Sequence, residues 1–496
     1  MLLSEICEKS GMKMSAKDDI EITGITADSR QVKPGFLFAA LPGLILDGRD
    51  FIESAASEGA TAILVPEGTQ LDSILTSSET NNVQLISDAN PRKRFALIAA
   101  SFYDRQPEKV AAVTGTNGKS SVVEFTRQIW NILHFKAASL GTLGTLGIRS
   151  GQVSNLANLT TPDPVKLHLT LSKLAGEGIS HLALEASSHG LEQHRLDGIR
   201  LDVGAFTNLT RDHLDYHHSM DEYFSAKKRL FGEILSADGI AVLNADVPHF
   251  KELSKLCNTR GVEVLSYGRL GNYIHLSKTR PNKDGNLINI TVSGKPYELP
   301  LPLVGEFQVS NALCALGICL ATGAETTRAV DSLSTIEGVS GRLELIGQLL
   351  NGGRVYVDYA HTPDGLYSVL KTLRNHTTGR LAVVFGGGGD RDPGKRREMG
   401  SIAAKLADSI YITDDNPRHE DPSLIRANIL DGAPNGVEID DRAEAIRAAI
   451  SAIEANDVLL IAGKGHESSQ IIGDSRKSFS DAETARVALE NEWGNV

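Results

Sequence analysis

Two hydrophobic patterns alternate along this chain. Short apolar runs such as Val110–Val113, His181–Glu185 and Val458–Ala462 are typical of strands buried on both faces. Between them lie longer stretches in which apolar residues recur at helical spacing, for example Gln308–Thr322. Strands that alternate with helices build parallel sheets covered by helices on both sides. The pattern therefore predicts an α/β fold.

The alternation changes character twice. Short strands and helices are mixed over the first hundred residues, long regular alternation begins at Lys109, and a third alternating region begins near Arg342. A β-rich excursion is expected at Lys278–Leu301, with turn signals at Asp284-Gly285 and Gly294-Lys295. Since 496 residues exceed what one hydrophobic core usually supports, we predict three α/β domains at 1–106, 107–340 and 341–496.

The individual elements follow from the same patterns. Strands are expected at 22–28, 36–41, 60–65, 110–113, 181–185, 203–207, 240–244, 355–358, 381–385, 410–413 and 458–462. Helices are expected at 51–59, 92–103, 121–133, 164–177, 220–230, 308–322 and 365–375. The longest apolar run, Ala312–Ala321, falls well short of the roughly 20 residues that span a bilayer and predicts a buried helix.

Composition and charge exclude several classes of protein. A net charge of −12 argues against a protein that wraps nucleic acid, which would need a basic face. None of the four cysteines forms a C-x-x-C pair, so no zinc site is indicated and a reducing cytoplasm is expected. The N-terminal stretch lacks a basic start followed by an apolar core, and we therefore expect neither a signal peptide nor a membrane partner.

A glycine-containing turn joins a predicted strand to a predicted helix at Val110–Ser121 (VAAVTGTNGKSS). This arrangement holds nucleotide phosphates, because backbone N–H groups and the helix N-terminus point at the anion. Lys119 would reach the β- and γ-phosphates, and the Ser120 hydroxyl would bind Mg²⁺. The common P-loop pattern requires glycine where Val113 stands, so a chance glycine-rich turn is the alternative.

Polar residues at the ends of the next two strands are candidate metal and phosphate partners, because ligands bind outside the carboxyl ends of parallel strands. Glu185 ends one strand, and His213 follows another. Mg²⁺ prefers oxygen ligands, which favours Glu185; a helix-capping carboxylate and a structural histidine are the respective alternatives. Lys227 lies on a predicted helix in the sequence SAKKR, and composition alone predicts a solvent-exposed lysine there.

Three further residues lie near the second predicted boundary. Asn311 is near the start of an apolar helix, where its side chain would cap the helix or contact a base edge. Arg342 follows the hinge-like stretch Gly338–Gly341 and could reach a phosphate in the neighbouring domain. Asp358 ends a strand and would accept a sugar hydroxyl or orient that arginine.

Three strand ends of the third domain offer groups that suit a zwitterionic amino acid. Arg391 lies in a glycine-rich stretch after one strand, Asp415-Asn416-Pro417-Arg418 follows the second, and Gly463–Glu467 follows the third. Arginines pair with carboxylates, and Glu467 would accept an ammonium group. A surface cluster of ion pairs is the alternative. A dinucleotide fingerprint at Phe385–Arg397 is disfavoured, because this charged stretch contains Pro393 where a small residue should pack a helix on the sheet.

Taken in order, these and further motifs resemble the Mur ligases over essentially the whole chain, and within them the branch that adds the third residue of the peptidoglycan stem peptide. The matching segments are VTGTNGKSS, TTPDP, LEASSHGLEQHR, FTNLTRDHLDYH, SAKKRLF, VLNAD, GRLE, VDYAHTPD, GGDRD, DDNPR and GKGHE. The shortened glycine loop is the form that this family uses. One departure is the loop Gly43–Asp47, which is more apolar than usual.

The resemblance implies a fold and a division of labour. It implies a uridine-binding first domain, a central P-loop-type ATPase domain with a mostly parallel sheet, and a Rossmann-like C-terminal domain that binds the amino acid. The muramoyl-peptide substrate would contact Ser29, Arg30, Gly48, Thr160, Thr161, Ser187, Gln193 and Arg195. ATP would contact Gly115, Thr116, Asn117, Gly118, Lys119, Ser120, Ser121, Asn311, Arg342 and Asp358.

The resemblance also implies which residues bind the metal, carry out catalysis and bind the amino acid. Mg²⁺ would be held by Ser120, Glu185, His213 and a carbamylated Lys227. Lys119, Glu185, His213, Lys227 and Arg342 would be the catalytic residues. The amino acid would contact Arg391, Asp415, Asn416, Pro417, Arg418, Gly463 and Glu467.

The implied reaction joins meso-diaminopimelate to UDP-MurNAc-L-Ala-D-Glu in cytoplasmic peptidoglycan precursor synthesis. ATP would activate the D-glutamyl carboxylate as an acyl phosphate, and ADP would be released. In this family the DNPR motif with Arg418 goes with diaminopimelate, whose distal carboxylate lysine lacks. Lysine-adding and folylpolyglutamate-forming ligases are the enzyme alternatives, and a non-catalytic ATP-binding sensor of the precursor is the third. A monomer is expected.

Overall fold

The described chain forms two compact units in a computed structural model. The model describes residues 1–12, 19–43, 46–69, 83–140, 148–150, 153–155, 161–282 and 285–493. The first unit comprises Met1–Lys109, Thr161–Ser180 and Ala186–Leu201, and the second comprises Val110–Thr160, His181–Glu185 and Asp202–Val496. Two segments that we expected within the second domain thus cluster with the N-terminal residues. The α/β class is confirmed, whereas the boundaries near 106 and 340 remain predictions.

The first unit contains a four-stranded, fully parallel sheet in the order β1-β2-β3-β4. Its strands are β1 (Gly24–Thr26), β2 (Phe36–Ala39), β3 (Ala62–Pro66) and β4 (Gln84–Asp88). Its helices are α1 (Leu3–Lys9), η1 (Ser29–Gln31), η2 (Gly48–Phe51), α2 (Ile52–Ser57), α3 (Pro91–Tyr103), α5 (Pro164–Gly176) and α6 (Ser188–Glu192). Leu37 and Phe38 belong to separate apolar clusters on opposite faces, as the period of two along a strand requires.

The second unit contains an eleven-stranded sheet in the order β15-β14-β13-β12-β11-β10-β5-β9-β6-β7-β8. Its strands are β5 (Lys109–Thr114), β6 (Ala137–Leu140), β7 (Ile148–Ser150), β8 (Val153–Asn155), β9 (His181–Glu185), β10 (Leu201–Phe206), β11 (Leu235–Asn244), β12 (Glu263–Gly268), β13 (Ile274–Asn282), β14 (Gly285–Val292) and β15 (Lys295–Leu301). The predicted excursion is the antiparallel hairpin pair β13-β14-β15. Asp284, in one predicted turn, lies outside the described residues.

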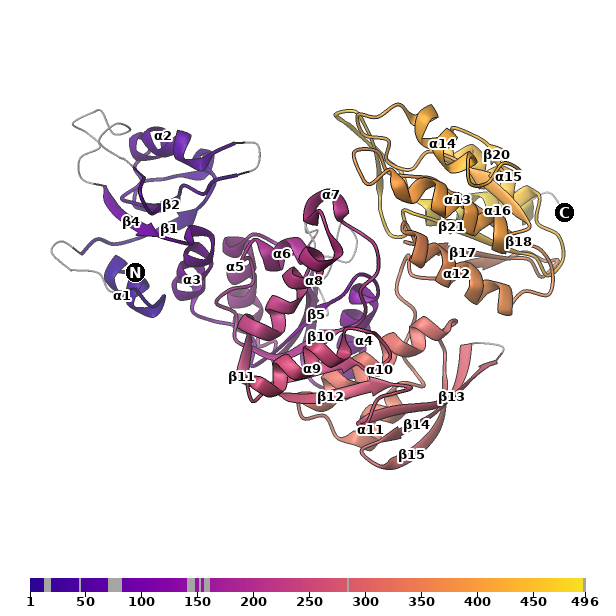
Figure 1. The fold of residues 1–496 in the computed structure, drawn as a ribbon, viewed down its shortest axis with the longest axis horizontal. Helices are drawn as coiled ribbons and strands as arrows, with labels where there is room; N and C mark the ends of the chain where they lie inside the picture. Colours follow the sequence, from indigo (N-terminus) through magenta and orange to yellow (C-terminus); the bar gives the residue numbers. More distant parts are fainter. Residues whose placement is uncertain are drawn as a thin grey trace. The chain divides into compact units, whose positions relative to one another are not determined.

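Helices cover this sheet, and their apolar side chains form a hydrophobic core with those of the strands. They are α4 (Lys119–Ile132), α7 (Leu214–His217), α8 (Met220–Arg229), η4 (Leu230–Ile234), α9 (Phe250–Thr259), α10 (Glu306–Ala321) and α11 (Thr326–Ser332). Helices α4 and α10 pack on each other beside the sheet (Figure 1). The run Ala312–Ala321 lies in α10, and Leu313 and Leu316 are fully buried. The prediction of a buried helix is confirmed.

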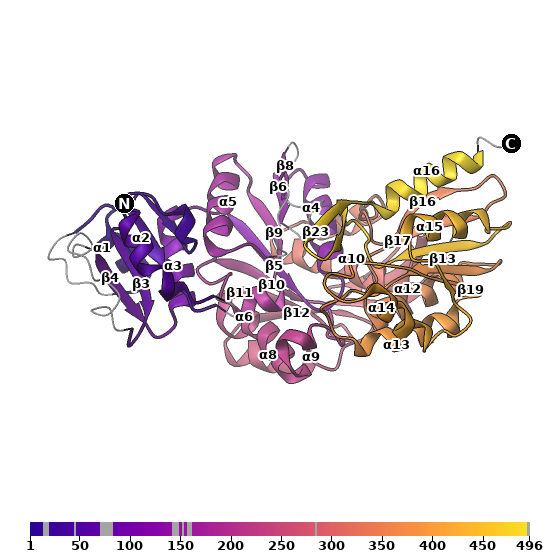
Figure 2. The ribbon, with the colours of Figure 1, turned by 90° about the horizontal axis from the view of Figure 1, so that it is seen from above.

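The second unit also contains an antiparallel hairpin of β22 (Ser469–Ile472) and β23 (Ser475–Ser478). Its remaining sheet has six strands, in the order β16-β17-β21-β18-β19-β20. Its elements are β16 (Glu344–Gln348), β17 (Arg354–Asp358), α12 (Pro363–Asn375), β18 (Leu381–Phe385), α13 (Gly394–Leu406), β19 (Ser409–Ile412), α14 (Pro422–Leu430), β20 (Val437–Glu438), α15 (Arg442–Ser451), β21 (Val458–Ala462) and α16 (Asp481–Trp493). Helices α12 and α13 lie on one face of this sheet and α15 and α16 on the other (Figure 2). Val383 belongs to the apolar cluster with α12 and α13, and Val384 to the cluster with α15 and α16. Strands buried on both faces explain why these runs are continuously apolar.

Capping residues fix where several helices begin. Asp163 accepts a hydrogen bond from Lys166 N at 3.0 Å, and Thr362 accepts one from Gly365 N at 3.2 Å. Each of these caps precedes a proline at the first helical position, where its missing N–H costs nothing. The helix expected from Gly365 therefore begins two positions earlier, at Pro363.

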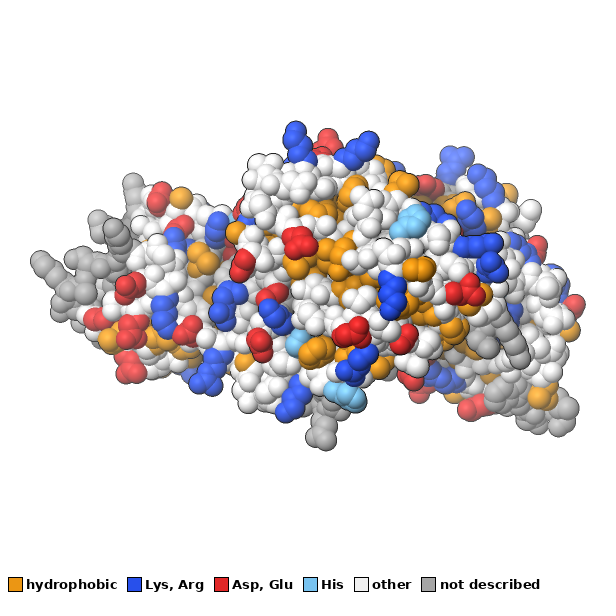
Figure 3. Space-filling view, turned by 90° about the horizontal axis from the view of Figure 1, so that it is seen from below, with side chains coloured by type: hydrophobic (Ala, Val, Ile, Leu, Met, Phe, Trp, Pro, Cys, Tyr) orange, Lys and Arg blue, Asp and Glu red, His pale blue; other side chains and the backbone are white. Residues whose placement is uncertain are grey.

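The surface mixes charges of both signs. On the face drawn in Figure 3, lysine and arginine side chains are interspersed with aspartate and glutamate. All four cysteines are buried and none of them is in a disulfide. Within the residues that the structure describes, no helix is both long and apolar enough to cross a membrane.

A buried ion pair fastens α16 to the six-stranded sheet. Arg442 donates to Asp481 through Nε at 2.7 Å and Nη2 at 2.8 Å, and both side chains are completely buried. Arg442 also donates to the backbone oxygens of Ala462 and Asp414, at the ends of β21 and β19. Removing Asp481 would leave a buried guanidinium without its counter-ion.

We predict that Asp481→Ala lowers the free energy of unfolding of this part of the chain by about 3 kcal/mol. The measurement is a urea titration with hydrogen exchange of the β21 amides. Glu454→Ala breaks the exposed Arg380–Glu454 pair and serves as the control, with an expected loss below about 1 kcal/mol. Equal losses for the two variants would contradict the prediction.

Candidate functional site

The phosphate loop, residues Gly115–Ser120, connects β5 to α4. Gly115 and Gly118 have φ angles of +148° and +89°, and a Cβ atom at Gly118 would overlap the side-chain oxygen of Asn311. Asn208 anchors the loop, because its backbone oxygen accepts from Thr116 N and its side-chain oxygen from Asn117 N, both at 2.9 Å. The loop is thus a fixed structure, which disfavours a chance glycine-rich turn.

Two lysines converge on one carbonyl oxygen of this loop. Lys119 Nζ donates to Gly115 O at 2.9 Å and to Thr116 O at 2.8 Å, and Lys227 Nζ donates to the same Gly115 O at 2.9 Å. Burial lowers the pKa of Lys119, which Glu185 opposes. Burial and the charge of Lys119 hold the pKa of Lys227 well below its usual value.

Composition predicts that Lys227 is exposed, and this prediction is therefore wrong. Lys227 is 1% exposed and lies over the ring of Tyr223, with Nζ 4.3 Å from the ring centroid. Helix α8 turns this residue inward, because its apolar residues Tyr223 and Phe224 pack on the sheet and Lys227 follows Tyr223 by one turn. Only the family resemblance gave the residue a role in the site.

The metal candidates lie at the ends of neighbouring strands. Glu185 is 1% exposed at the end of β9, and Ser120 is buried in the first turn of α4. His213 has a φ of +55° and its Nε2 lies 3.4 Å from Asp212 Oδ2. In the part of the chain that the structure describes, no three His, Cys, Asp or Glu residues are grouped to hold a metal ion. A cation here would need the serine hydroxyl and phosphate oxygens as well.

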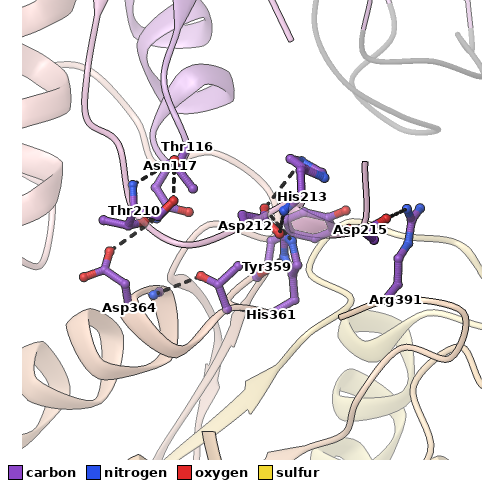
Figure 4. A network of polar contacts seen from close by, with 12 residues as sticks. Thr116, Asn117, Thr210, Asp212, His213, Asp215, Tyr359, His361, Asp364 and Arg391 are labelled. Carbon is purple, nitrogen blue, oxygen red and sulfur yellow. Dashed lines mark hydrogen bonds and ion pairs between the residues drawn. The ribbon is translucent and has the colours of Figure 1, made fainter. Parts of the chain in front are cut away.

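A polar network joins the loop after β10 to the six-stranded sheet (Figure 4). Burial would raise the pKa of Asp212, but a hydrogen bond from His361 and the charge of His213 outweigh it and hold the pKa far below its usual value. Asn117 Nδ2 lies 3.4 Å from Asp364 Oδ2, and Arg391 Nη1 lies 3.3 Å from Asp215 Oδ2. Residues of both sheets thus share one charged region.

Arg342 belongs to this region. Its Nη2 donates to Ser120 Oγ at 3.2 Å, and its guanidinium carbon lies 4.5 Å from the centroid of the Tyr359 ring. Asp358 accepts from Leu343 N and Ala360 N, both at 2.7 Å, and so fixes the backbone beside Arg342. Burial raises the pKa of Asp358 to about 6, although the charge of Arg342 opposes the shift. Arg342 thus contacts the phosphate loop, and its predicted contact with a phosphate stays a prediction.

Asn311 does not cap its helix. Helix α10 begins at Glu306, so Asn311 lies inside it, is 6% exposed and donates to Gln308 Oε1 at 3.0 Å. The capping alternative is wrong, because Gly305 occupies the N-cap position. Asn311 instead lies against Gly118 of the phosphate loop.

The three strand ends of the six-stranded sheet do meet. Strands β21, β18 and β19 are parallel neighbours, so the residues that follow them emerge at one edge. Asn416 Nδ2 donates to Glu467 Oε2 at 2.9 Å. Arg418 Nη1 donates to Gly389 O at 2.8 Å, and Pro417 packs against Gly389, which has no room for a side chain. The predicted cluster is confirmed as a set of neighbours, although Arg391 is paired with Asp215.

Sequence reasoning missed two side chains of this cluster, those of Lys464 and Tyr359. Lys464 is completely buried and lies between Asp415, Asn416 and Glu467. Gly463, with a φ of +116°, has no room for a Cβ beside Asp415. Tyr359 Oη donates to Glu467 Oε1 at 3.5 Å. The position of Lys464 between two glycines after a buried strand was the available signal.

The expected muramoyl-peptide residues that the structure describes lie in the first unit. Thr161 and Ser187 hydroxyls are 3.0 Å apart, and Arg195 donates to Thr161 O at 2.8 Å and to Gln193 Oε1 at 2.7 Å. These four residues form one hydrogen-bonded group.

The uridine candidates lie elsewhere in that unit. Ser29 and Arg30 lie in η1, where Arg30 pairs with Asp28 at 2.8 Å, and Gly48 begins η2 against the backbone of Leu41. Thr160 lies outside the described residues.

Comparisons with known proteins agree along the chain. Family models match at residues 21–103 (Mur ligase family, catalytic domain), 113–319 (Mur ligase middle domain) and 341–465 (Mur ligase, glutamate ligase domain). A UDP-N-acetylmuramoyl-L-alanyl-D-glutamate--2,6-diaminopimelate ligase from Caulobacter vibrioides is 48% identical over 95% of this chain and 96% of its own length.

Solved structures extend the comparison. A structure of a UDP-N-acetylmuramoyl-L-alanyl-D-glutamate--2,6-diaminopimelate ligase matches with a TM-score of 0.70 and 32% identity over 99% of both chains. A folylpolyglutamate synthase from Mycobacterium tuberculosis, complexed with ADP and AMPPCP, matches with a TM-score of 0.64 and 19% identity, over 80% of this chain and 94% of its own. That second likeness concerns the fold alone. The matches to the family models and to relatives of nearly equal length show that this chain belongs to the Mur ligase family.

Proposed function

We propose that this chain is an ATP-dependent, ADP-forming ligase that joins meso-2,6-diaminopimelate to UDP-N-acetylmuramoyl-L-alanyl-D-glutamate in peptidoglycan precursor synthesis. The observation that carries the proposal is near full-length identity of 44–48% to relatives that all bear this ligase's name. The reaction requires sites for ATP, the amino acid and the UDP-linked dipeptide, and the phosphate loop and the amino-acid cluster of the second unit support the first two.

The chemistry needs an activated carboxylate, because a carboxylate does not react with an amine directly. Transfer of the γ-phosphoryl group of ATP to the D-glutamyl carboxylate forms an acyl phosphate and ADP. The amine of diaminopimelate then attacks the acyl carbon, and phosphate leaves. We infer that Lys119 and Arg342 offset the charge that develops on the transferring group, since both contact the phosphate loop.

A divalent cation fits the donors near the phosphate loop. Ser120 and the buried Glu185 provide oxygen donors of the kind that Mg²⁺ prefers, and we infer that these residues, with His213, would hold it. When bound, Mg²⁺ would neutralise phosphate charge.

Lys227 would complete this set as a carbamate. A lysine reacts with CO₂ only as the neutral amine, and burial beside Lys119 favours that form. The carbamate of Lys227 is an anion, so it would attract the charge of Lys119.

The amino-acid cluster supports diaminopimelate over lysine. The Arg418 guanidinium lies beside Gly388, where a distal carboxylate could pair with it, whereas near Gly388 Arg391 presents its aliphatic stem and pairs its guanidinium with Asp215. Lysine has no second carboxylate for such a pair. All five expected catalytic residues, Lys119, Glu185, His213, Lys227 and Arg342, are present in the sequence, which disfavours a non-catalytic sensor. We further propose a monomer that acts in the cytoplasm.

We predict that Lys119→Ala lowers kcat at least about 10²-fold, because a cation that stabilises the transferring phosphoryl group is lost. The measurement is ADP release with UDP-MurNAc-L-Ala-D-Glu and diaminopimelate. Lys136→Ala, at an exposed lysine that follows the same helix, is the control and should retain full activity. Undiminished ADP release in Lys119→Ala would refute the assigned role.

We predict that Arg418→Ala raises the KM for diaminopimelate about 10–100-fold, because a charge-assisted pair with the distal carboxylate is lost. Any turnover of lysine should change less than twofold, since lysine makes no such pair. Arg476→Ala, at an exposed arginine on the neighbouring hairpin, is the control. Equal turnover of lysine and diaminopimelate by the unaltered protein would contradict the proposed specificity.

We predict that native mass spectrometry at mildly alkaline pH detects one CO₂ adduct, and that acid removes it as the carbamate is protonated and decomposes. Lys227→Arg should lack the adduct, because guanidinium does not form a stable carbamate. Lys228→Arg, at the neighbouring exposed pair with Glu252, should retain it. An adduct that persists in Lys227→Arg would place the modification at another residue.

A further inference from the structure

Lys464 is a buried cation in the amino-acid cluster that has no role in the chemistry above. Its side chain is 0% exposed, in the loop that follows β21. Nζ lies 2.9 Å from Asn416 Oδ1, 3.2 Å from Glu467 Oε2 and 3.5 Å from Asp415 Oδ1. A lysine ammonium has three protons and no acceptor, and here it makes two hydrogen bonds, to Asn416 and Glu467, and an ion pair with Asp415. Lys464 is therefore placed to act on its neighbours rather than on a ligand.

The contact with Asn416 determines which way its amide points. Asn416 Oδ1 accepts from Lys464 Nζ and from Ile471 N, both at 2.9 Å. The reversed amide would turn its NH₂ group toward these two donors, which is unfavourable. The amide nitrogen is therefore fixed on the other side, where it donates to Glu467 Oε2.

The charges of the cluster reinforce this arrangement. Burial would raise the pKa of Asp415, but the charges of Lys464 and Arg442 outweigh it and hold that pKa below its usual value. Lys464 balances one of the two carboxylates, Asp415 and Glu467, that it contacts. The cluster thus keeps a fixed donor, Asn416 Nδ2, directly beside an acceptor that still carries charge, Glu467.

We infer that Lys464 is a positioning residue for the incoming amino acid: it fixes Asn416 as a hydrogen-bond donor and Glu467 as an acceptor, the paired arrangement that an amino acid's carboxylate and ammonium require. The inference rests on the proposed function, because it concerns the amino-acid cluster of that same reaction. It predicts that Lys464 affects the amino-acid step and leaves the nucleotide and UDP-linked substrates unaffected.

The test is Lys464→Met, which keeps the volume and removes the charge. The KM for diaminopimelate should rise about 10–100-fold, as for loss of hydrogen bonds to charged groups, while the KM values for ATP and UDP-MurNAc-L-Ala-D-Glu change less than twofold. Lys405→Met, at an exposed lysine of α13, is the matched control and should change none of them. A uniform fall in kcat with unchanged KM values would overturn the inference.

A double-mutant cycle distinguishes positioning from a merely structural role. If Lys464 acts through Asn416, then Lys464→Met should raise the KM for diaminopimelate less than threefold in an Asn416→Ala background, because contacting residues are non-additive. Full additivity of the two substitutions would show that Lys464 does not act through Asn416 and would overturn the inference.

A variant that does not fold, and a failure of the proposed function itself, must each be distinguished from failure of this inference. If Lys464→Met does not fold, Asp415→Asn/Lys464→Met removes the unpaired buried carboxylate and is measured in its place; failure of both to fold would mark Lys464 as purely structural and refute the inference. The unaltered protein is assayed alongside. Absence of diaminopimelate-dependent ADP release in that protein would refute the proposed function, whereas normal release with an unchanged KM in the variant would refute only this inference.

Discussion

Two lysine side chains that donate to one carbonyl oxygen are the central electrostatic constraint of this molecule. Lys119 and Lys227 both donate to Gly115 O at 2.9 Å, and Arg342 contacts the adjacent Ser120. Cations held this close repel one another unless anions neutralise them, so the site is arranged for negatively charged ligands. The rigid loop, the buried Glu185 and the turn of α8 that brings Lys227 inward all serve to hold these charges in place.

The amino-acid cluster satisfies its charges in a different way. There the cation is Lys464, and three oxygens of the same cluster already surround it. The phosphate loop leaves positive charge to be matched by a ligand, whereas this cluster is nearly complete by itself and offers oriented hydrogen-bonding groups. Buried polar groups that are fully satisfied fix one geometry, which is what recognition of a zwitterion demands.

Much of the fold could be predicted from the sequence, because the signals are local. The continuous apolar runs of the strands, the proline after the capping residue Asp163, and the apolar run in α10 each depend on residues close in the chain. The phosphate loop and the strand-end clusters were also found in this way. The start of α12 was predicted two positions too late, at Gly365, because this glycine in the first turn concealed where the helix begins.

The sequence by itself determined the alternation of strands and helices, the glycine loop with Lys119, and the order of motifs that marks the family. Tertiary structure alone decided which ordinary-looking residues became part of a site. Lys227 is buried by a contact that spans 112 residues, Asn311 lies against Gly118 rather than capping its helix, and Lys464 is enclosed by oxygens from two loops. Burial and charge pairing depend on which distant segments meet, and the local pattern around a lysine carries no information about that.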